Sequence, residues 1–340
     1  MTPELRQAAD RFLVRYGGDR FEQLFTRASG SVVYDDTGRE ILDFTSGQMC
    51  ATIGHNHPEI VKAIQLAGET ALHMFSGMIP TVVAELGQTL ANDWLPAPLQ
   101  RSLFVNTGSE ANEAALRMAK MYTGGYEVLA MGGSWHGVTG GSASATFASD
   151  RKGYGPSLPG LYMIPEPNNY RPLVDGVSPD ENARMCLEIG LKMYDDQSRG
   201  APAAIILEPI LSAGGVLVPP KSFMAGLRKA ADERGMLLIF DEAQTAFGRI
   251  GDTFGANYFG VTPDIMSLSK TLGGGLPLAA TVTSDVIEQD IHDKGFTFYT
   301  SHVADPLPAQ AGLAVLKTIV QDDLIARARE MGDYLNEQLK

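Results

Sequence analysis

Short apolar runs alternate with helical patterns along most of this chain. Helical periodicity falls between several of the runs, at 110–122, 180–195 and 222–234. Strands that alternate with helices predict a mostly parallel central sheet with helices on both faces. We therefore expect an α/β fold in which ligands bind outside the carboxyl ends of the strands. The apolar runs lie at 102–105, 127–131, 203–207, 236–240, 264–268 and 278–283.

The segments on either side of this alternation predict further elements. Residues 5–28 indicate a helix followed by a loop, and Ser31–Phe44 indicates a β-hairpin. Helical periodicity predicts helices at Pro58–Glu69 and Val82–Trp94. An amphipathic helix is expected over 320–340, with no capping glycine and no following strand, so we expect a truncated chain.

Three ionisable residues each follow the end of a predicted strand: Glu208, Asp241 and Lys270. Because the carboxyl ends of parallel strands meet at one edge of a sheet, we expect these residues to converge on one crevice. A lysine can form a Schiff base with a carbonyl compound, and a carboxylate can hold a ring nitrogen protonated. The pairing therefore indicates pyridoxal phosphate as the cofactor. The alternatives are that Asp241 caps the next helix and that Lys270 lies at the surface.

A turn of small residues precedes the predicted helix at 110–122. Free N–H groups at the start of a helix bind anions, and the helix dipole favours negative charge there. The alternative is an ordinary helix cap made by Ser109, with Glu113 nearby. The acid and the lysine described above favour a phosphate site, whose residues would be Thr107, Gly108 and Ser109.

Trp135 is one of two tryptophans and lies in a glycine-rich loop after the predicted strand at 127–131. Its ring could stack on a flat heteroaromatic group, or it could fill the core beneath the loop. His136 beside it is either a base or a hydrogen-bonding residue of the loop. Gln244 lies three residues after Asp241 and could reach the phenolic oxygen of such a cofactor.

Composition argues against several other classes of protein. The net charge of −13 argues against nucleic acid or an anionic membrane as the main partner. No apolar run approaches the roughly 18 residues of a membrane span, and the N-terminus lacks a signal core, so we expect a cytoplasmic protein. Two cysteines, Cys50 and Cys186, cannot form a disulfide framework and are expected to be buried thiols. The histidines show no zinc-type spacing, and no G-x-S-x-G motif is present.

These motifs together resemble the class III (subgroup II) aminotransferases of the fold-type I pyridoxal phosphate enzymes. The resemblance is most specific at Gln48 and Met49, where the chain is similar to the members that decarboxylate 2,2-dialkylglycines. Ordinary ω-aminotransferases usually carry an aliphatic residue in place of Gln48. Other matching segments are Ser134–Gly137, Leu207–Ser212, Asp241–Thr245 and Phe298–Pro306.

The resemblance implies a large domain and a small domain. The N-terminal part of the small domain would be 1–45, and the large cofactor-binding domain would be 46–310. Residues 311–340 would begin a helix that leads to a missing C-terminal part of the small domain. That part supplies the family's arginine for the substrate carboxylate, and no residue of this chain is assigned to the role. Ala213 stands where the decarboxylating members have a serine.

The resemblance also implies roles for the site residues. Lys270 would carry the cofactor and move protons, Asp241 would pair with its ring nitrogen, and Gln244 would contact its phenolic oxygen. Gln48 would orient the substrate carboxylate so that the bond aligned with the π system breaks. The other implied cofactor contacts are Trp135, His136, Glu208, the phosphate-binding Thr107, Gly108 and Ser109, and Ser301 from the neighbouring subunit of a homodimer or dimer of dimers.

A structural alkali ion, K⁺ or Na⁺, is implied as well, with ligands from Met74, Ser76, Ser301, Val303 and Asp305. The expected reaction converts a 2,2-dialkylglycine and pyruvate into a ketone, CO2 and L-alanine. The first alternative is a class III ω-aminotransferase that acts on amino and keto acids without decarboxylation. The second is a fragment that binds the cofactor but is inactive.

Overall fold

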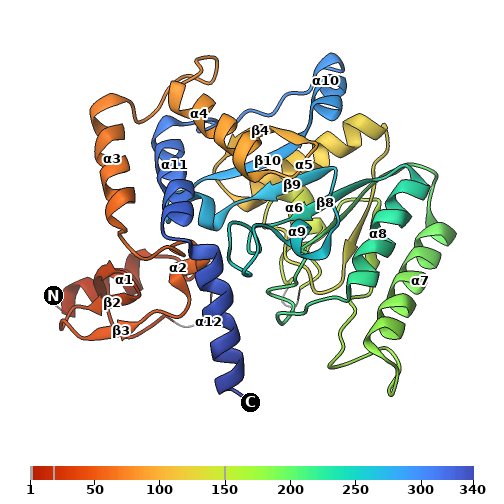
Figure 1. Cartoon of the computed structure of the whole chain (residues 1–340), viewed down its shortest axis with the longest axis horizontal. Helices are drawn as coiled ribbons and strands as arrows, with labels where there is room; N and C mark the ends of the chain where they lie inside the picture. The colour runs from red at the N-terminus through yellow and green to blue at the C-terminus, as the bar shows by residue number, and fades with distance from the viewer. Residues whose placement is uncertain (1–2, 18–19, 149–150) are drawn as a thin grey trace.

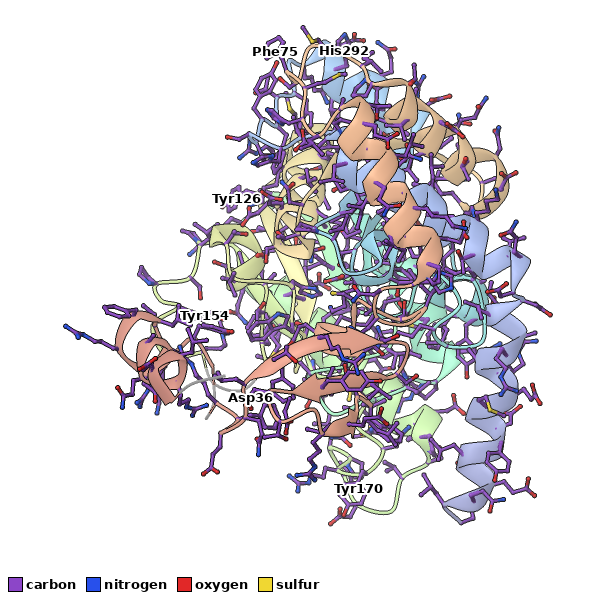
Figure 2. The ribbon with its side chains drawn as sticks, turned by 90° about the vertical axis from the view of Figure 1, so that its left-hand side faces the viewer. Asp36, Phe75, Tyr126, Tyr154, Tyr170 and His292 are labelled. Carbon is purple, nitrogen blue, oxygen red and sulfur yellow. The ribbon has the colours of Figure 1, made fainter. Side chains whose placement is uncertain are left out.

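The computed structural model describes residues 3–17, 20–148 and 151–340. At the N-terminus a helix, α1, precedes a three-stranded antiparallel sheet in the order β1-β2-β3. Figure 1 shows this part of the chain at one side of the molecule, and Figure 2 labels Asp36 in the turn after β2. The bounds of these elements are α1 Pro3–Phe12, β1 Phe25–Ser29, β2 Val32–Asp35 and β3 Glu40–Leu42.

A seven-stranded sheet in the order β4-β10-β9-β8-β7-β5-β6 forms the centre of the molecule. β10 runs antiparallel to both of its neighbours, and the other pairs from β9 to β6 are parallel. The prediction of a mostly parallel sheet is therefore confirmed. Its strands are β4 Leu99–Val105, β5 Glu127–Met131, β6 Leu161–Ile164, β7 Pro202–Leu207, β8 Leu237–Asp241, β9 Ile265–Leu268 and β10 Ala279–Ser284.

Both faces of the central sheet are packed. Successive residues of a strand point to opposite faces, and alternate residues of β7 and β8 belong to separate core clusters. Ile206 and Ile239 pack with α5 (Gly108–Thr123) on one face. Ile205 and Leu238 belong to the cluster on the other face, which includes residues of α7 (Pro179–Gln197) and α8 (Lys221–Arg234). The layered α/β fold with helices on both faces is as predicted (Figure 1).

The remaining helices connect these layers. The expected helix at 320–340 is α12 (Leu324–Gln338), which has no buried residue and extends from the main body in Figure 1. No described helix is long and apolar enough to span a membrane. The other helical segments are α2 Ser46–Met49, α3 Pro58–Thr70, α4 Thr81–Thr89, the π-helix η1 Leu90–Trp94, α6 Gly140–Ser144, α9 Gly255–Phe259, the 3₁₀ helix η2 Lys270–Gly273, α10 Asp285–Asp293 and α11 Pro306–Gln321.

Two strands differ from the sequence-based expectation. Residues 5–28 were expected to form a helix and a loop, but β1 begins at Phe25 and pairs with β2. β6 was not predicted, because it is a four-residue edge strand that is only partly buried. β1 lacks the dense apolar run that marks the central strands and depends on pairing with β2 rather than on burial. β6 is apolar throughout but only four residues long.

Candidate active site

A cavity of about 350 Å³ lies where β4, β8 and β9 end. Its walls come from parts of the chain that are far apart in sequence. As predicted for a sheet of this kind, the polar residues gather at the carboxyl ends of the strands. The predicted site residues that line the cavity are Gln48, Thr107, Gly108, Ser109, Trp135, His136, Asp241 and Lys270.

Asp241 is the buried acid of this cavity, with 3% of its surface exposed. Its Oδ2 accepts hydrogen bonds from His136 Nδ1 at 2.9 Å and from Asn112 Nδ2 at 2.7 Å. Its Oδ1 accepts the backbone N–H of Ala243 at 3.1 Å. Three donors compensate a buried carboxylate for its lost hydration. Asp241 does not cap a following helix, because α9 begins only at Gly255.

Two buried polar atoms beside Asp241 have no hydrogen-bond partner among the described residues: His136 Nε2 and Asn112 Oδ1. The His136 side chain is fully buried, and both residues line the cavity. Buried polar atoms are nearly always paired in folded proteins, so unpaired atoms at a cavity indicate a polar ligand. Sequence reasoning missed Asn112, although a polar residue among the buried alanines of α5 was a usable signal.

Lys270 is half-buried and lines the cavity, so it is not the surface lysine of the alternative interpretation. It is the first residue of η2, in the connection between β9 and β10. Its φ of 49° lies in the left-handed region, which is unfavourable for a residue with a Cβ atom. Strain of this kind concentrates at functional sites, where surrounding contacts maintain it.

The start of α5 forms another wall of the cavity. Thr107 caps this helix, since its hydroxyl accepts the Glu110 N–H at 3.2 Å while Glu110 Oε2 accepts the Thr107 N–H at 3.2 Å. The alternative in which Ser109 caps the helix is therefore wrong; Ser109 Oγ accepts the Val138 N–H at 3.1 Å. The first N–H groups of a helix have no partner within it. The backbone N–H groups of Gly108 and Ser109, at the N-terminus of a 16-residue helix, are therefore available to an anion.

Close backbone approach shapes this anion site. A Cβ atom at Gly108 would lie 3.1 Å from Ser269 Oγ. At Gly137, where φ is +137°, a Cβ atom would lie 2.3 Å from Ser109 Oγ. The loop that carries Trp135 can therefore contact the start of α5 only with glycine at position 137.

Trp135 is 39% exposed and lines the cavity, where its ring face is available to a flat ligand. Its backbone N–H donates to Glu208 Oε1 at 2.8 Å, and Ser212 Oγ donates to Glu208 Oε2 at 2.8 Å. Burial, followed by the charge of Asp241, raises the pKa of Glu208. Gln244 donates to Ser212 Oγ. Glu208 and Gln244 therefore support the loop of Trp135 and are not among the residues that line the cavity.

Gln48 and Cys50 also line the cavity, although they lie more than 200 residues before Lys270 in the sequence. Cys50 is half-buried, so the expectation that both cysteines are buried holds only for Cys186. Burial raises the pKa of Cys50, and the positive charges of Lys270 and Arg249 oppose this effect. Burial raises the pKa of Cys186 to about 11.

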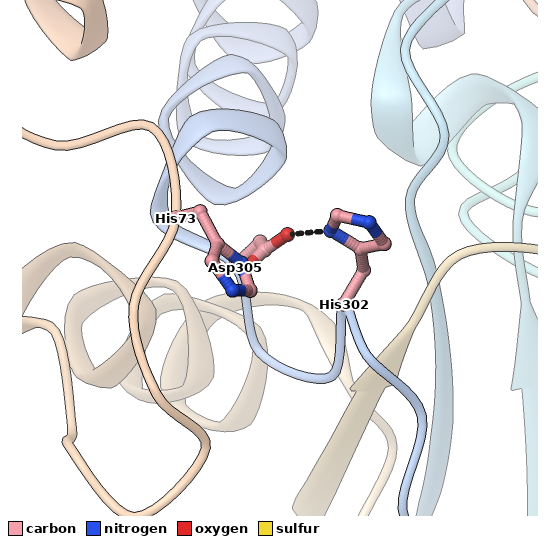
Figure 3. A group of neighbouring side chains, drawn as sticks. All are labelled: His73, His302 and Asp305. Atoms are coloured by element: carbon pink, nitrogen blue, oxygen red, sulfur yellow. Dashed lines mark hydrogen bonds and ion pairs between the residues drawn. The ribbon is translucent and has the colours of Figure 1, made fainter.

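Asp305 accepts hydrogen bonds from two histidines in this structure (Figure 3). His73 Nδ1 and His302 Nδ1 each lie 2.6 Å from one of its carboxylate oxygens. Asp305 is 7% exposed, and 232 residues separate it from His73, so sequence reasoning missed this cluster. The predicted alkali-ion ligands flank it: Met74 and Ser76 follow His73, while Ser301 and Val303 adjoin His302. Ser301 is exposed and is not among the cavity-lining residues.

The mixed sheet and the cavity with its lysine and aspartate define a fold-type I pyridoxal phosphate-dependent transferase. The family described as aminotransferase class-III matches residues 15–340. The chain belongs to this class-III aminotransferase family. An uncharacterised aminotransferase of Schizosaccharomyces pombe is 48% identical over 331 residues, which cover 97% of this chain and 74% of that protein.

Solved structures of transaminases have the same fold. An (S)-enantioselective ω-transaminase from Thermomicrobium roseum has a TM-score of 0.93 at 28% identity, covering 99% of this chain and 79% of its own. An ω-transaminase of Pseudomonas jessenii in complex with PMP has a TM-score of 0.91 at 27% identity, covering 97% and 77%. A PLP-bound amine transaminase from an uncultivated Pseudomonas species has a TM-score of 0.91 at 30% identity, covering 97% and 79%.

Proposed function

We propose that this chain binds pyridoxal phosphate in the cavity and moves an amino group from an amine or amino acid to a keto acid. The observation that carries the proposal is that Lys270 and Asp241 line one cavity, beside the free N-terminus of α5. Family membership and the likeness to PLP- and PMP-bound transaminases support it. The bound cofactor would supply an electron sink for the bonds at the substrate carbon.

Each residue of the cavity has a distinct task in this proposal. Asp241, held by His136 and Asn112, would keep a ring nitrogen protonated. The N–H groups at the start of α5 would bind the phosphate, and Trp135 would cover one ring face. Lys270 would anchor the cofactor and then carry a proton to and from the substrate carbon. Ser301 would complete the phosphate site of a neighbouring subunit in a homodimer.

The test is reconstitution of the chain with pyridoxal phosphate. We expect the visible absorbance of a lysine-bound cofactor and conversion of pyruvate to alanine with an amine donor. Lys270→Ala should lose both. Lys294→Ala is the matched control, because Lys294 is a surface lysine paired with Asp290 at 2.6 Å. Absorbance without turnover would indicate an inactive cofactor-binding fragment, and absence of both would contradict the proposal.

One observation favours a second candidate, decarboxylating transamination of 2,2-dialkylglycines. Gln48 lines the cavity with Lys270, and its side-chain amide can donate to a carboxylate there. Holding the carboxylate out of the plane of the cofactor ring would align the C–CO2 bond with the π system, and a 2,2-dialkylglycine has no hydrogen on its α-carbon that could leave instead. The products with pyruvate would be a ketone, CO2 and L-alanine.

Release of CO2 from 2-aminoisobutyrate separates the two candidates. The decarboxylating enzyme should release CO2 and acetone in equal amounts, with alanine formed from pyruvate. Gln48→Ala should reduce CO2 release at least about tenfold more than it reduces amino transfer from alanine. If 2-aminoisobutyrate yields no CO2 while other donors are transaminated, the ω-aminotransferase candidate remains alone.

A further inference from the structure

The segment that carries Gln48 has an unusual backbone. Ser46, Gly47 and Met49 have φ values of 52°, 64° and 60°, so Gln48 lies between left-handed residues. Two of these three residues have a Cβ atom, which makes the left-handed conformation unfavourable. Such a conformation persists only where surrounding contacts maintain it. The residues that provide those contacts therefore determine where Gln48 lies.

Asp43 holds the N-terminal side of this segment. Its Oδ1 accepts the Thr45 N–H at 2.8 Å and the Thr45 hydroxyl at 2.6 Å. Its Oδ2 accepts the Gly47 N–H at 2.6 Å and lies 2.7 Å from His55 Nε2. Burial by itself would raise the pKa of Asp43, but the hydrogen bonds from Thr45, His55 and Gly47 outweigh it and hold the pKa well below its usual range.

Arg249 holds the C-terminal side. Its Nη1 donates to the Met49 carbonyl oxygen at 2.9 Å, across 200 residues of sequence. Burial lowers the pKa of Arg249, and Cys50 opposes this effect. Among the described parts of the chain, no carboxylate forms an ion pair with Arg249. Arg249 is therefore half-buried without an acidic partner among the described residues, and the Met49 carbonyl is its hydrogen-bond acceptor.

The loop that carries Arg249 is itself fixed by α12. A Cβ atom at Gly248 would lie 2.7 Å from Ile325 Cγ1, and one at Gly251 would lie 2.9 Å from Arg329 Cβ. Arg329 also donates to the Gly251 carbonyl oxygen. The helix α12 therefore packs against Gly248 and Gly251, the residues that flank the Arg249 turn.

We propose that Arg249 is a positioning residue: through the Met49 carbonyl it fixes Gln48 against the cavity and so determines how a substrate carboxylate is held. This inference rests on the proposed contact of Gln48 with substrate. Arg249 itself is not among the residues that line the cavity, so it acts through Gln48. It distinguishes 2-aminoisobutyrate, whose carboxylate the Gln48 amide would hold for decarboxylation, from plain amines, which have no carboxylate to hold.

The first experiment measures half-reactions of the cofactor-loaded protein with 2-aminoisobutyrate as the carboxylate donor and with a plain primary amine. Arg249→Ala should lower kcat/KM at least about tenfold for the carboxylate donor, leave the plain amine within about twofold, and leave the cofactor's visible absorbance unchanged. Arg249→Lys keeps one donor for the Met49 carbonyl and should recover most of the loss. Equal losses for both donors would mean a merely structural role and would overturn the inference.

Arg228→Ala is the matched control. Arg228 is also partly buried, but it pairs with Asp264 at 2.7 Å and is not among the cavity-lining residues. Its removal should lower stability without changing the preference between the two donors. A change of preference as large as that of Arg249→Ala would overturn the inference, since any buried arginine would then have the same effect.

A double-mutant cycle separates this inference from the proposed function. If Arg249 acts through Gln48, adding Arg249→Ala to Gln48→Ala should cause no further loss beyond about twofold. If the loss in the double variant equals the product of the two single losses, the positioning role is overturned. If Gln48→Ala alone is impaired while Arg249→Ala is normal, this inference fails and the role of Gln48 stands. If Gln48→Ala is normal for every donor, the role of Gln48 fails, and the inference fails with it.

Discussion

The imidazole of His136 and the carboxylate of Asp241 form a buried pair, with 2.9 Å between Nδ1 and Oδ2. When Nδ1 carries the proton, Nε2 is an acceptor, and no described residue donates to it. The side chains of the pair are 0% and 3% exposed, so water does not compete for Asp241. The cavity therefore presents a carboxyl group, held by His136 and Asn112, to any ring nitrogen that enters it.

Replacing Asp241 with asparagine should slow the chemistry and leave the cofactor bound. The variant lacks the carboxylate that is proposed to keep a ring nitrogen protonated, and we expect kcat to fall about 100- to 1000-fold. Single-turnover rates with alanine measure the effect. Glu242→Gln makes the same chemical change one residue away, at a side chain that does not line the cavity. Its kcat should stay within about threefold of that of the unchanged protein. Equal rates for the two variants would contradict the assignment.

The backbone at Lys270 should make glycine more favourable there than alanine. Its φ of 49° is accessible to glycine without strain, whereas a Cβ atom is unfavourable in this region. We expect Lys270→Gly to be more stable to unfolding than Lys270→Ala by about 1 kcal/mol. Urea denaturation of the two inactive variants without cofactor checks this. A more stable alanine variant would show that the left-handed conformation is not maintained in solution.

A side chain at Gly137 should disturb the phosphate site. The added Cβ atom meets Ser109 Oγ, so Gly137→Ala should separate the Trp135 loop from the start of α5. We expect the Kd for pyridoxal phosphate to rise about tenfold or more, which corresponds to about 1.4 kcal/mol. Fluorescence titration of Trp135 can follow binding. Gly140→Ala is the control, because a Cβ atom there meets nothing within 4 Å.

Glu242 should make stability depend on pH. It is fully buried and accepts the N–H groups of Gly255 and Ala256, both at 2.8 Å. Burial raises its pKa from 4.5 to about 7, against the effect of these hydrogen bonds and that of Thr245. Because the folded-state pKa is the higher one, the stability that Glu242 contributes is complete below pH 4.5 and is lost as pH rises through 7.

The difference in unfolding free energy between the parent and Glu242→Gln isolates this effect. Between pH 5 and pH 8 the parent should lose on the order of 3 kcal/mol more than the variant, as an upper bound from the shift in pKa. Chemical denaturation at both pH values is the measurement. Parallel pH profiles for the two proteins would show that Glu242 titrates normally.

The Asp305 cluster allows a test of the implied alkali ion. An ion bound by Asp305 would compete with His73 and His302 for its carboxylate oxygens. If it binds, replacing K⁺ by tetramethylammonium should lower activity several-fold, and Asp305→Asn should remove the dependence on the cation. Substituting glutamine for either histidine should strengthen the dependence. If the activity of the unchanged protein is the same with K⁺ and with tetramethylammonium, the implied site is contradicted.

The central sheet could be predicted because its strands are dense apolar runs with helices between them. The exposed strand β1 could not, because its residues resemble loop residues until a neighbouring strand pairs with them. The edge strand β6 is apolar throughout, but its four residues are a short signal that sequence reasoning missed. Asp241 and Lys270 could be predicted from their places at strand ends. The partners that define their chemistry, such as Asn112, reach them only through tertiary contacts and leave little local signal.

Roles that depend on which way a side chain points were the hardest to predict. Gln244 has suitable spacing from Asp241, yet its side chain turns to Ser212. Ser109 stands in a typical capping turn, yet Thr107 caps the helix. In both cases residue type and spacing allow two outcomes, and a hydrogen bond from a distant or neighbouring group decides between them.

The antiparallel direction of β10 has a mechanical consequence. A parallel strand after β9 would need a long crossover, whereas residues 269–278 suffice to connect β9 to its antiparallel neighbour. Lys270 therefore lies in a short connection whose two ends are hydrogen-bonded into the same sheet. The position of Lys270 is thus set by the sheet, whereas Gln48, on the facing wall of the cavity, depends on contacts of a separate segment.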